Sequence, residues 1–459
     1  MRNQRGVALF SLIFFFSWLS TVREALSLSL HRQRRRHTAN NNINNEAPSA
    51  TMTNHRRSLL LKFFATAFVS SSVLLPSAQS FVSVDPTAGS SSAAATASAA
   101  ADPATTTKNS AVVAYKSLSL SMNDVLLGVD EAVEVPIACW FPAGDERQQG
   151  PTAAESAVRY KHRISVRRIG QLLAGWNLPG FVARNFELEP SLMSSAAASA
   201  LSPSALVVNG QDLDLPKRSW PVVLLAHGYL GSRFDLSHLA EELAAMGFVC
   251  LAPEYPESLA ASYERIEGLD RKKITDKLLE TLEGEWDVQP SSYGVVGHSL
   301  GCGTAIETGD DESWTRVCVA GFPRTRDGRS LPGKKLLFVA SMNDGAVSLS
   351  KYGGKSAVPS DLPILEDIIR GSPPPAMLPN RAAIVLDGPN APNHVSFLAS
   401  GVGNAMVDFL SPLLPVAQTF NIPVLDFDRY KQSQDSRETA RLVHPVVIQY
   451  LKQHMVLQS

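Results

Sequence analysis

The stretch SSYGVVGHSLGCGTAIET, residues 291–308, decides the fold. Its first half is an apolar run typical of a buried strand, and its second half is typical of a helix. Between them, Gly297-His298-Ser299-Leu300-Gly301 has the pattern G-x-S-x-G. A strand that turns sharply into a helix can expose a serine hydroxyl above a sheet, provided that small residues stand two before and two after it. This context favours Ser299 as a nucleophile over a tight turn with an incidental serine.

Strand-like and helical patterns alternate on both sides of this stretch. Apolar runs predict further strands at 219–228, 247–257, 314–322, 334–344 and 381–388, and periodic segments predict helices at 234–246, 273–286 and 440–455. Two earlier runs, 111–129 and 133–142, are typical of an antiparallel pair. Strict alternation with apolar strands predicts a parallel sheet that is covered on both faces. No Gly-rich fingerprint follows the run 219–228, so a dinucleotide-binding fold has no support.

A candidate acid and a candidate base follow Ser299 along the chain, in the order serine, acid, histidine that is known for serine nucleophiles of the G-x-S-x-G type. Asp344 ends one predicted strand, and His394 lies in the loop after the next one. We expect His394 to remove the serine proton and Asp344 to hold its imidazole in one tautomer. Asp327 and Asp387 are the competing acids, and His444 in the closing helix is the rival base.

Half of an oxyanion hole is expected where the first parallel strand ends, at His227-Gly228-Tyr229. The backbone N–H groups of Tyr229 and Leu300 would point at the oxygen that becomes negative in the tetrahedral intermediate. The side chain of His227 is expected to pack the loop.

Residues 219–301 and 336–398 look like the α/β-hydrolase superfamily. The resemblance implies an α/β-hydrolase fold, with a mostly parallel central sheet, helices on both faces and a lid-like insertion. The segments 133–144 and 221–258, with Tyr160, resemble platelet-activating-factor acetylhydrolase-like and dienelactone-hydrolase-like esterases, and plant chlorophyllases are similar in the same stretch. In the acetylhydrolases the acid ends the strand after the nucleophile helix, where VCVAGFP (317–323) has no Asp. Chlorophyllases typically carry Arg after the nucleophile, where this chain has Leu300.

The expected function is hydrolysis of a carboxylic ester, of a lipid or another hydrophobic small molecule, through an acyl-enzyme on Ser299. A chlorophyllase-like plastid esterase and a non-catalytic binding module of the same fold are the alternatives. No metal or organic cofactor is expected. Insertions at 143–218 and 395–430 either shape an apolar substrate pocket or simply pack onto the core.

Charge and cysteine content exclude other classes. The formal net charge of -1 gives no electrostatic reason to expect nucleic acid as a partner. The four cysteines are scattered, and three of them stand in apolar runs, which is typical of buried small hydrophobes rather than of a disulfide framework or a metal site. The oligomeric state is left open.

The head of the chain is predicted to be a targeting region, 1–80, with ten Lys/Arg against two Glu. A signal-like apolar run, an Arg- and Asn-rich stretch at 31–45 and a second apolar run at 59–75 follow one another, and the series resembles the import signals of algae whose plastids lie inside extra membranes. The small residues before Phe81 predict cleavage after Ser80 and a plastid location, in the thylakoid lumen. The alternative is a secretory or membrane-anchored protein that contacts a bilayer surface. A low-complexity linker, 81–107, should precede the hydrolase domain, 108–459.

Overall fold

The computed structural model describes a defined set of residues. They are 111–122, 132–143, 158–161, 164–165, 168, 172, 187–188, 191–193, 205–216, 219–259, 268–310, 312–322, 329–347, 349–366, 376–402 and 435–456. The chain divides into two units, Met1–Pro103 and Ala104–Ser459, and every described residue lies in the second. The predicted targeting region and linker therefore lie outside the described residues.

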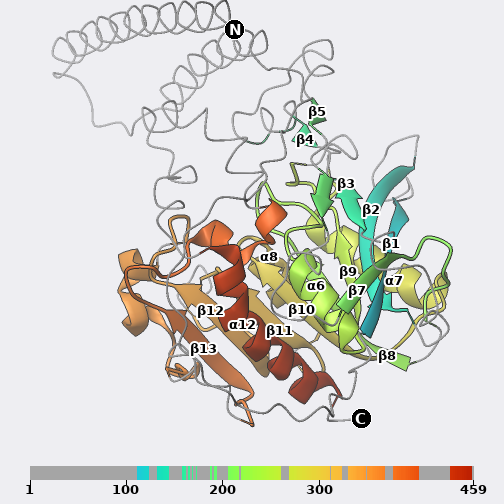
Figure 1. Cartoon of the computed structure of the whole chain (residues 1–459). Coiled ribbons are helices and arrows are strands. Elements are labelled where there is room, and N and C mark those ends of the chain that lie inside the picture. The colour runs from blue at the N-terminus through green and yellow to red at the C-terminus, as the bar shows by residue number, and fades with distance from the viewer. Residues whose placement is uncertain are drawn as a thin grey trace, which may run out of the picture. The chain divides into compact units, whose positions relative to one another are not determined.

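The described part is built around a nine-stranded sheet in the order β13-β12-β11-β10-β8-β9-β2-β1-β7 (Figure 1). The strands are β1 (Ala111–Met122), β2 (Val133–Pro142), β7 (Ala205–Asn209), β8 (Ser219–Ala226), β9 (Val249–Pro253), β10 (Gln289–His298), β11 (Thr315–Val319), β12 (Lys335–Ser341) and β13 (Arg381–Leu386). The six strands from β13 to β9 run parallel, whereas β2 is antiparallel to both β9 and β1. Two small sheets join β3 (Arg159–Lys161) to β6 (Ser191–Met193) and β4 (Ile164–Ser165) to β5 (Glu187–Leu188).

Helices cover both faces of this sheet because its strands are apolar on both sides. In β8, Val223 and Leu225 belong to one core cluster, and Val222 and Leu224 belong to the other. The first cluster includes α6 (Ser237–Ala245) and α12 (Ser436–Leu451). The second includes α7 (Arg271–Gly284), α8 (Gly301–Glu307) and the short helices η3 (Leu349–Tyr352) and η4 (Gly354–Ala357). The predicted α/β class, a mostly parallel sheet covered on both faces, is confirmed.

Two long helices begin at aspartates that cap them. The carboxylate of Asp270 accepts the N–H of Lys273 at 2.8 Å at the start of α7, and Asp435 accepts the N–H of Glu438 at 2.8 Å at the start of α12. Each cap satisfies one of the backbone donors that a helix start leaves unpaired, and such caps contribute about 1 kcal/mol.

A buried polar chain fixes the antiparallel edge to the first covering helix. The indole N–H of Trp140 in β2 donates to the hydroxyl of Tyr160 at 2.7 Å, and that hydroxyl donates to Glu241 of α6 at 2.6 Å. All three side chains are buried, and burial followed by the nearby Glu241 raises the pKa of Tyr160 well above its usual value. Because each polar atom has a partner, the chain specifies this packing without leaving an unsatisfied group.

Strand β7 differs from the sequence-based expectation for 143–218. That range was expected to be an insertion that shapes the pocket or packs onto the core, yet its five-residue segment Ala205–Asn209 pairs parallel to β1 and extends the main sheet. The pairing buries Val207 and Val208. This end of the range is therefore part of the scaffold.

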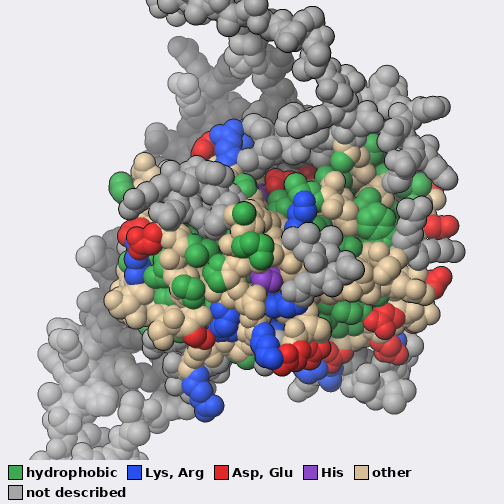
Figure 2. Space-filling view, turned by 90° about the horizontal axis from the view of Figure 1, so that it is seen from below, with side chains coloured by type: hydrophobic (Ala, Val, Ile, Leu, Met, Phe, Trp, Pro, Cys, Tyr) green, Lys and Arg blue, Asp and Glu red, His purple; other side chains and the backbone are tan. Residues whose placement is uncertain are grey.

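Within the described ranges, no helix is both long and apolar enough to cross a membrane. On the face shown in Figure 2, acidic and basic side chains of the described residues lie close to one another.

Candidate active site

Ser299 stands on a strained turn between β10 and α8. Its φ is 55°, in the left-handed region, and its N–H donates to the carbonyl of Val319 at the end of β11 at 2.9 Å. A Cβ on Gly297 would lie 2.1 Å from the carbonyl oxygen of Gly301, and one on Gly301 would lie 2.0 Å from that of Ala226 in β8. Both positions require glycine because the backbone approaches so closely there. The left-handed conformation of Ser299 costs about 1–3 kcal/mol of conformational free energy, which interactions with the surrounding strands must offset. The turn holds Ser299 at the end of a central strand.

The predicted acid and base are in contact. Asp344, three residues after β12, is 1% exposed, and its Oδ2 lies 2.9 Å from Nδ1 of His394. Its Oδ1 accepts the backbone N–H groups of Ala346 and Val347 at 2.8 and 2.7 Å. The carboxylate thus holds the proton of His394 on Nδ1, which leaves Nε2 as the nitrogen that can accept a proton.

The backbone around His394 is fixed by a short capped helix, η6 (His394–Phe397). Asn393, which is fully buried, accepts the N–H of His394 and receives a reciprocal cap, because its own N–H donates to Ser396 Oγ at 3.1 Å. The amide of Asn343, next to the acid, donates to the carbonyl of Ala391 at 3.1 Å. The loops that carry the acid and the base are therefore joined directly.

His298 joins the loop that carries His394 to the turn at Ser299. Its Nε2 donates to the carbonyl of His394 at 3.0 Å, and the two rings lie 4.8 Å apart between centroids. Burial, and then the neighbouring His394, lowers the pKa of His298 to about 3. His298 is therefore neutral and does not compete as the base. Since His298 directly precedes Ser299, this bond places the loop that carries His394 next to the turn at Ser299, while Asp344 contacts His394 directly.

The loop of His227, Gly228 and Tyr229, predicted to form half of an oxyanion hole, packs directly against Ser299. A Cβ on Gly228 would lie 3.1 Å from Cβ of Ser299, so the backbone just before Tyr229 packs against Ser299. Leu300 is the N-cap residue of α8, where backbone N–H groups have no partner inside the helix. Tyr229 and Leu300, which follow Gly228 and Ser299 in the chain, are 40% and 43% exposed.

Two side chains hold this loop, and the sequence pattern indicated only one of them. His227 donates from Nδ1 to the carbonyl of Gly228 at 2.8 Å and accepts the N–H of Tyr255 on Nε2 at 2.9 Å. The predicted packing role of His227 agrees with these contacts. Arg271, the first residue of α7, donates to the carbonyls of His227 at 2.8 Å and Gly228 at 3.4 Å. Nothing in the local sequence around Arg271 points to that contact.

Two of the three rival residues are described, and both have other partners. The side chain of Asp387 is 53% exposed, and its ion pair is with Lys355 at 3.9 Å. His444 in α12 packs edge to face on His238 with centroids 4.4 Å apart, and its Nδ1 lies 3.1 Å from Glu242. Asp327 lies outside the described residues.

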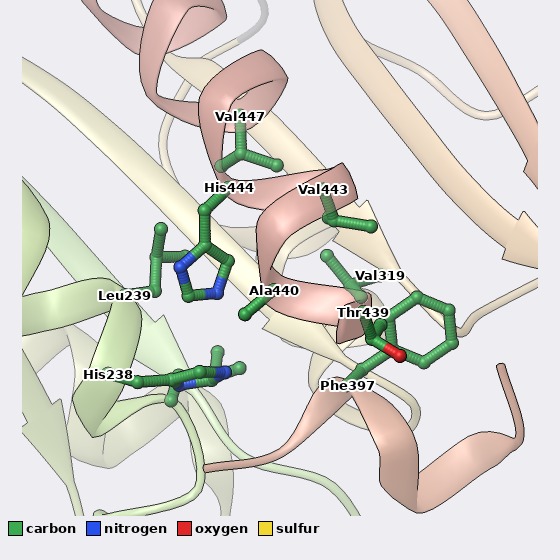
Figure 3. A pocket seen from close by; sticks show the side chains of 10 residues that line it. His238, Leu239, Val319, Phe397, Thr439, Ala440, Val443, His444 and Val447 are labelled. Carbon is green, nitrogen blue, oxygen red and sulfur yellow. The ribbon is translucent and has the colours of Figure 1, made fainter. Parts of the chain in front are cut away.

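An apolar pocket lies behind the base loop, between α6, α12 and η6 (Figure 3). His238 and His444 lie close together at its edge, and Phe397 of η6 and Val319 lie on the opposite side. Burial, followed by the nearby His444, lowers the pKa of His238 well below its usual value. Val395 and Phe397 are buried, so the start of the range 395–430 packs onto the core, and 403–430 lies outside the described residues.

The sheet order, the strained turn at Ser299 and the contact between Asp344 and His394 together define an α/β-hydrolase fold. Residues 185–278 match the family model described as "Platelet-activating factor acetylhydrolase, isoform II". The match covers about a fifth of the chain, includes His227, Gly228 and Tyr229, and stops before Ser299. It supports a hydrolase, and no curated protein matches the chain significantly.

The chain is also similar to two solved esterase structures. A ferulic acid esterase from Streptomyces cinnamoneus is 14% identical, with a TM-score of 0.41, over 77% of this chain and 92% of that one. An esterase from Pyrococcus furiosus is 12% identical, with a TM-score of 0.33, over 74% of this chain and 93% of that one. In the part of the chain that the structure describes, no group of His, Cys, Asp and Glu could hold a metal ion.

Proposed function

We propose that the protein is a serine hydrolase that cleaves carboxylic esters with hydrophobic groups, with Ser299 as the nucleophile. The observation that carries the proposal is the strained turn at Ser299, next to His298, which donates to the carbonyl of His394; Nδ1 of His394 lies 2.9 Å from the buried Asp344. A residue held in the left-handed region by three strands is a feature of functional sites, because the strain persists only where the surrounding structure fixes it.

The chemistry follows from the tautomer that the contact with Asp344 favours in His394. His394 Nε2 removes the proton of Ser299 as the hydroxyl attacks the ester carbonyl, and Asp344 stabilises the imidazolium that forms. The N–H groups of Tyr229 and Leu300 stabilise the negative oxygen of the tetrahedral intermediate. His394 then gives the proton to the leaving alcohol, and a water molecule, activated by the same base, releases the acid from the acyl-enzyme.

The surface beside the nucleophile supports an apolar ester. Tyr229 and Leu300 are among the few large hydrophobic side chains that stay exposed in the described residues, and they directly follow Gly228, which packs on Ser299, and Ser299 itself. Exposed apolar side chains close to a candidate nucleophile are typical of a ligand-binding surface. A ligand with apolar groups on either side of its carbonyl would cover both.

The test is the replacement of Ser299 by Ala. We expect kcat for p-nitrophenyl butyrate to fall by about 10⁶ and labelling by a fluorophosphonate probe to disappear, with the melting temperature little changed. Ser292→Ala, on the same strand, is the matched control and should keep both signals. Near-normal turnover in Ser299→Ala would overturn the proposal, and a wild-type protein that neither turns over esters nor takes the probe would indicate a binding module.

A further inference from the structure

Arg271 begins α7, 28 residues before the nucleophile in the chain, yet it reaches the oxyanion loop. Its side chain is 12% exposed and lies over the ring of Tyr255, 4.5 Å from the centroid. A cation in the first turn of a helix opposes the helix dipole, so this position gives no local stability that would explain an arginine. The contacts of its guanidinium give the reason.

One group of contacts fixes a single peptide plane. The carbonyl of Gly228 accepts Nη2 of Arg271 at 3.4 Å, Nδ1 of His227 at 2.8 Å and the N–H of Gly231 at 3.3 Å. The described chain contains no cis peptide bond, so the N–H of Tyr229 points away from that carbonyl in the same rigid plane. Whatever holds the carbonyl on one side therefore sets the direction of the Tyr229 N–H on the other.

A second group of contacts joins the two halves of the oxyanion hole. Nη1 of Arg271 donates both to the carbonyl of His227 at 2.8 Å and to Oγ1 of Thr304 in α8 at 3.3 Å. The helix α8 also carries the Leu300 N–H at its start. One planar guanidinium thus spans the loop after β8 and the helix after β10, and Glu257 holds its Nε at 3.0 Å.

We propose that Arg271 is a positioning residue that sets the geometry of the oxyanion hole. It aims the Tyr229 N–H through the Gly228 carbonyl and keeps that donor at a fixed distance from the Leu300 N–H. Its positive charge also polarises the same peptide, which strengthens the N–H as a donor where negative charge develops. This inference rests on the proposed function of Ser299.

The expected signature is a loss of transition-state binding with little loss of substrate binding. Arg271→Met keeps the apolar stem and removes the donors, so kcat for p-nitrophenyl butyrate should fall by about 10²-fold while KM stays within about twofold. Affinity for an alkyl trifluoromethyl ketone, which forms an oxyanion on serine, should fall by a similar factor. The kcat of Arg271→Lys should lie between those of the wild type and Arg271→Met, because a lysine carries the charge but lacks the planar guanidinium.

Thr304→Val removes only the contact with α8 and should show a smaller effect of the same kind, which keeps the test valid if Arg271→Met does not fold. Lys272→Met is the matched control, since this neighbour is exposed and pairs with Asp276. Full stoichiometric labelling by a fluorophosphonate, given time, reports that each variant is folded. Normal turnover in Arg271→Met would overturn the proposal. So would a lower stability and a higher KM with unchanged affinity for the ketone.

The two proposals fail differently. If wild-type protein and Ser299→Ala are equally inactive and neither binds the ketone, the serine mechanism is wrong and the Arg271 proposal is overturned with it. If the wild type is active and Ser299→Ala is not, the Arg271 variants test the positioning role alone.

Discussion

Replacing Asp344 with Asn alters the proton on the base while leaving the surrounding hydrogen bonds possible. The backbone N–H groups of Ala346 and Val347 both donate to Oδ1 of Asp344, so an asparagine there must place its carbonyl oxygen toward them. Its NH₂ group then faces Nδ1 of His394, 2.9 Å away in the native structure. A donor at that place forces Nδ1 to accept, and the imidazole proton moves to Nε2.

The magnitude follows from this tautomer. With a proton on Nε2, His394 cannot remove the proton of Ser299, and the loss expected for an acid-to-amide change of this kind is about 10⁴ in kcat. That factor corresponds to about 5.4 kcal/mol of transition-state stabilisation. We expect KM for p-nitrophenyl butyrate to change little. The melting temperature should also change little, because the caps at Ala346 and Val347 are retained.

The matched control is Asp387→Asn, because this aspartate stands on the loop that leads to His394 but its side chain is 53% exposed. It should keep more than half of the activity. A mild effect of Asp344→Asn, within tenfold of wild type, would refute the assignment, and a severe effect of Asp327→Asn would transfer the acid to the position that the acetylhydrolase resemblance implies.

Three further outcomes are expected. Gly301→Ala would place a Cβ 2.0 Å from the carbonyl of Ala226, so the variant should lose several kcal/mol of stability in denaturant titrations and most of its activity; a soluble, fully active variant would contradict the elbow geometry. Burial raises the pKa of Asp235 to about 7, so this carboxyl loses its proton near pH 4 when unfolded but near pH 7 when folded, and its contribution to stability is full below about pH 4 and is lost as pH rises from about 4 to about 7. Asp235→Asn should therefore raise the melting temperature relative to wild type more at pH 8 than at pH 5, and equal differences at both values would reject the shift. Finally, N-terminal sequencing of native protein should find cleavage after Ser80 and a fluorescent fusion of the targeting region should enter a plastid; a mature chain that keeps 59–75 would favour the membrane anchor.

The catalytic candidates could be predicted because each stands where a strand pattern ends. Ser299 interrupts an apolar run with two glycines, and Asp344 and His394 follow the next strands of a sheet whose parallel order brings their ends together. Each of these signals is local in the sequence, and the order serine, acid, histidine along the chain indicates that the three residues act together. The close approach of Gly301 to the carbonyl of Ala226 explains why a glycine stands two residues after Ser299.

The parts that sequence reasoning missed depend on contacts between distant segments. Arg271 opens an ordinary helix, and its partners are carbonyls more than 40 residues earlier, which leave no mark in the sequence. Strand β7 is five residues long and pairs with a strand about 90 residues before it, so its apolar run ALVV, 205–208, is too short to be separated from an insertion. His298 could only be recognised as a support for the base once its 3.0 Å bond to the carbonyl of His394 was known.

The strained turn at Ser299 has a consequence for folding. Its left-handed backbone is held by the Val319 carbonyl on β11 and is closed by the contact of Gly301 with β8, so no fragment of the chain that lacks either strand can form it. Parallel neighbours pair only after long crossovers are closed, which makes such sheets slow to assemble. During refolding, secondary structure should therefore return before the serine becomes reactive toward a fluorophosphonate. Reactivity of Ser299 would therefore report that the centre of the sheet is assembled. A partly folded chain would not hydrolyse an ester at this serine.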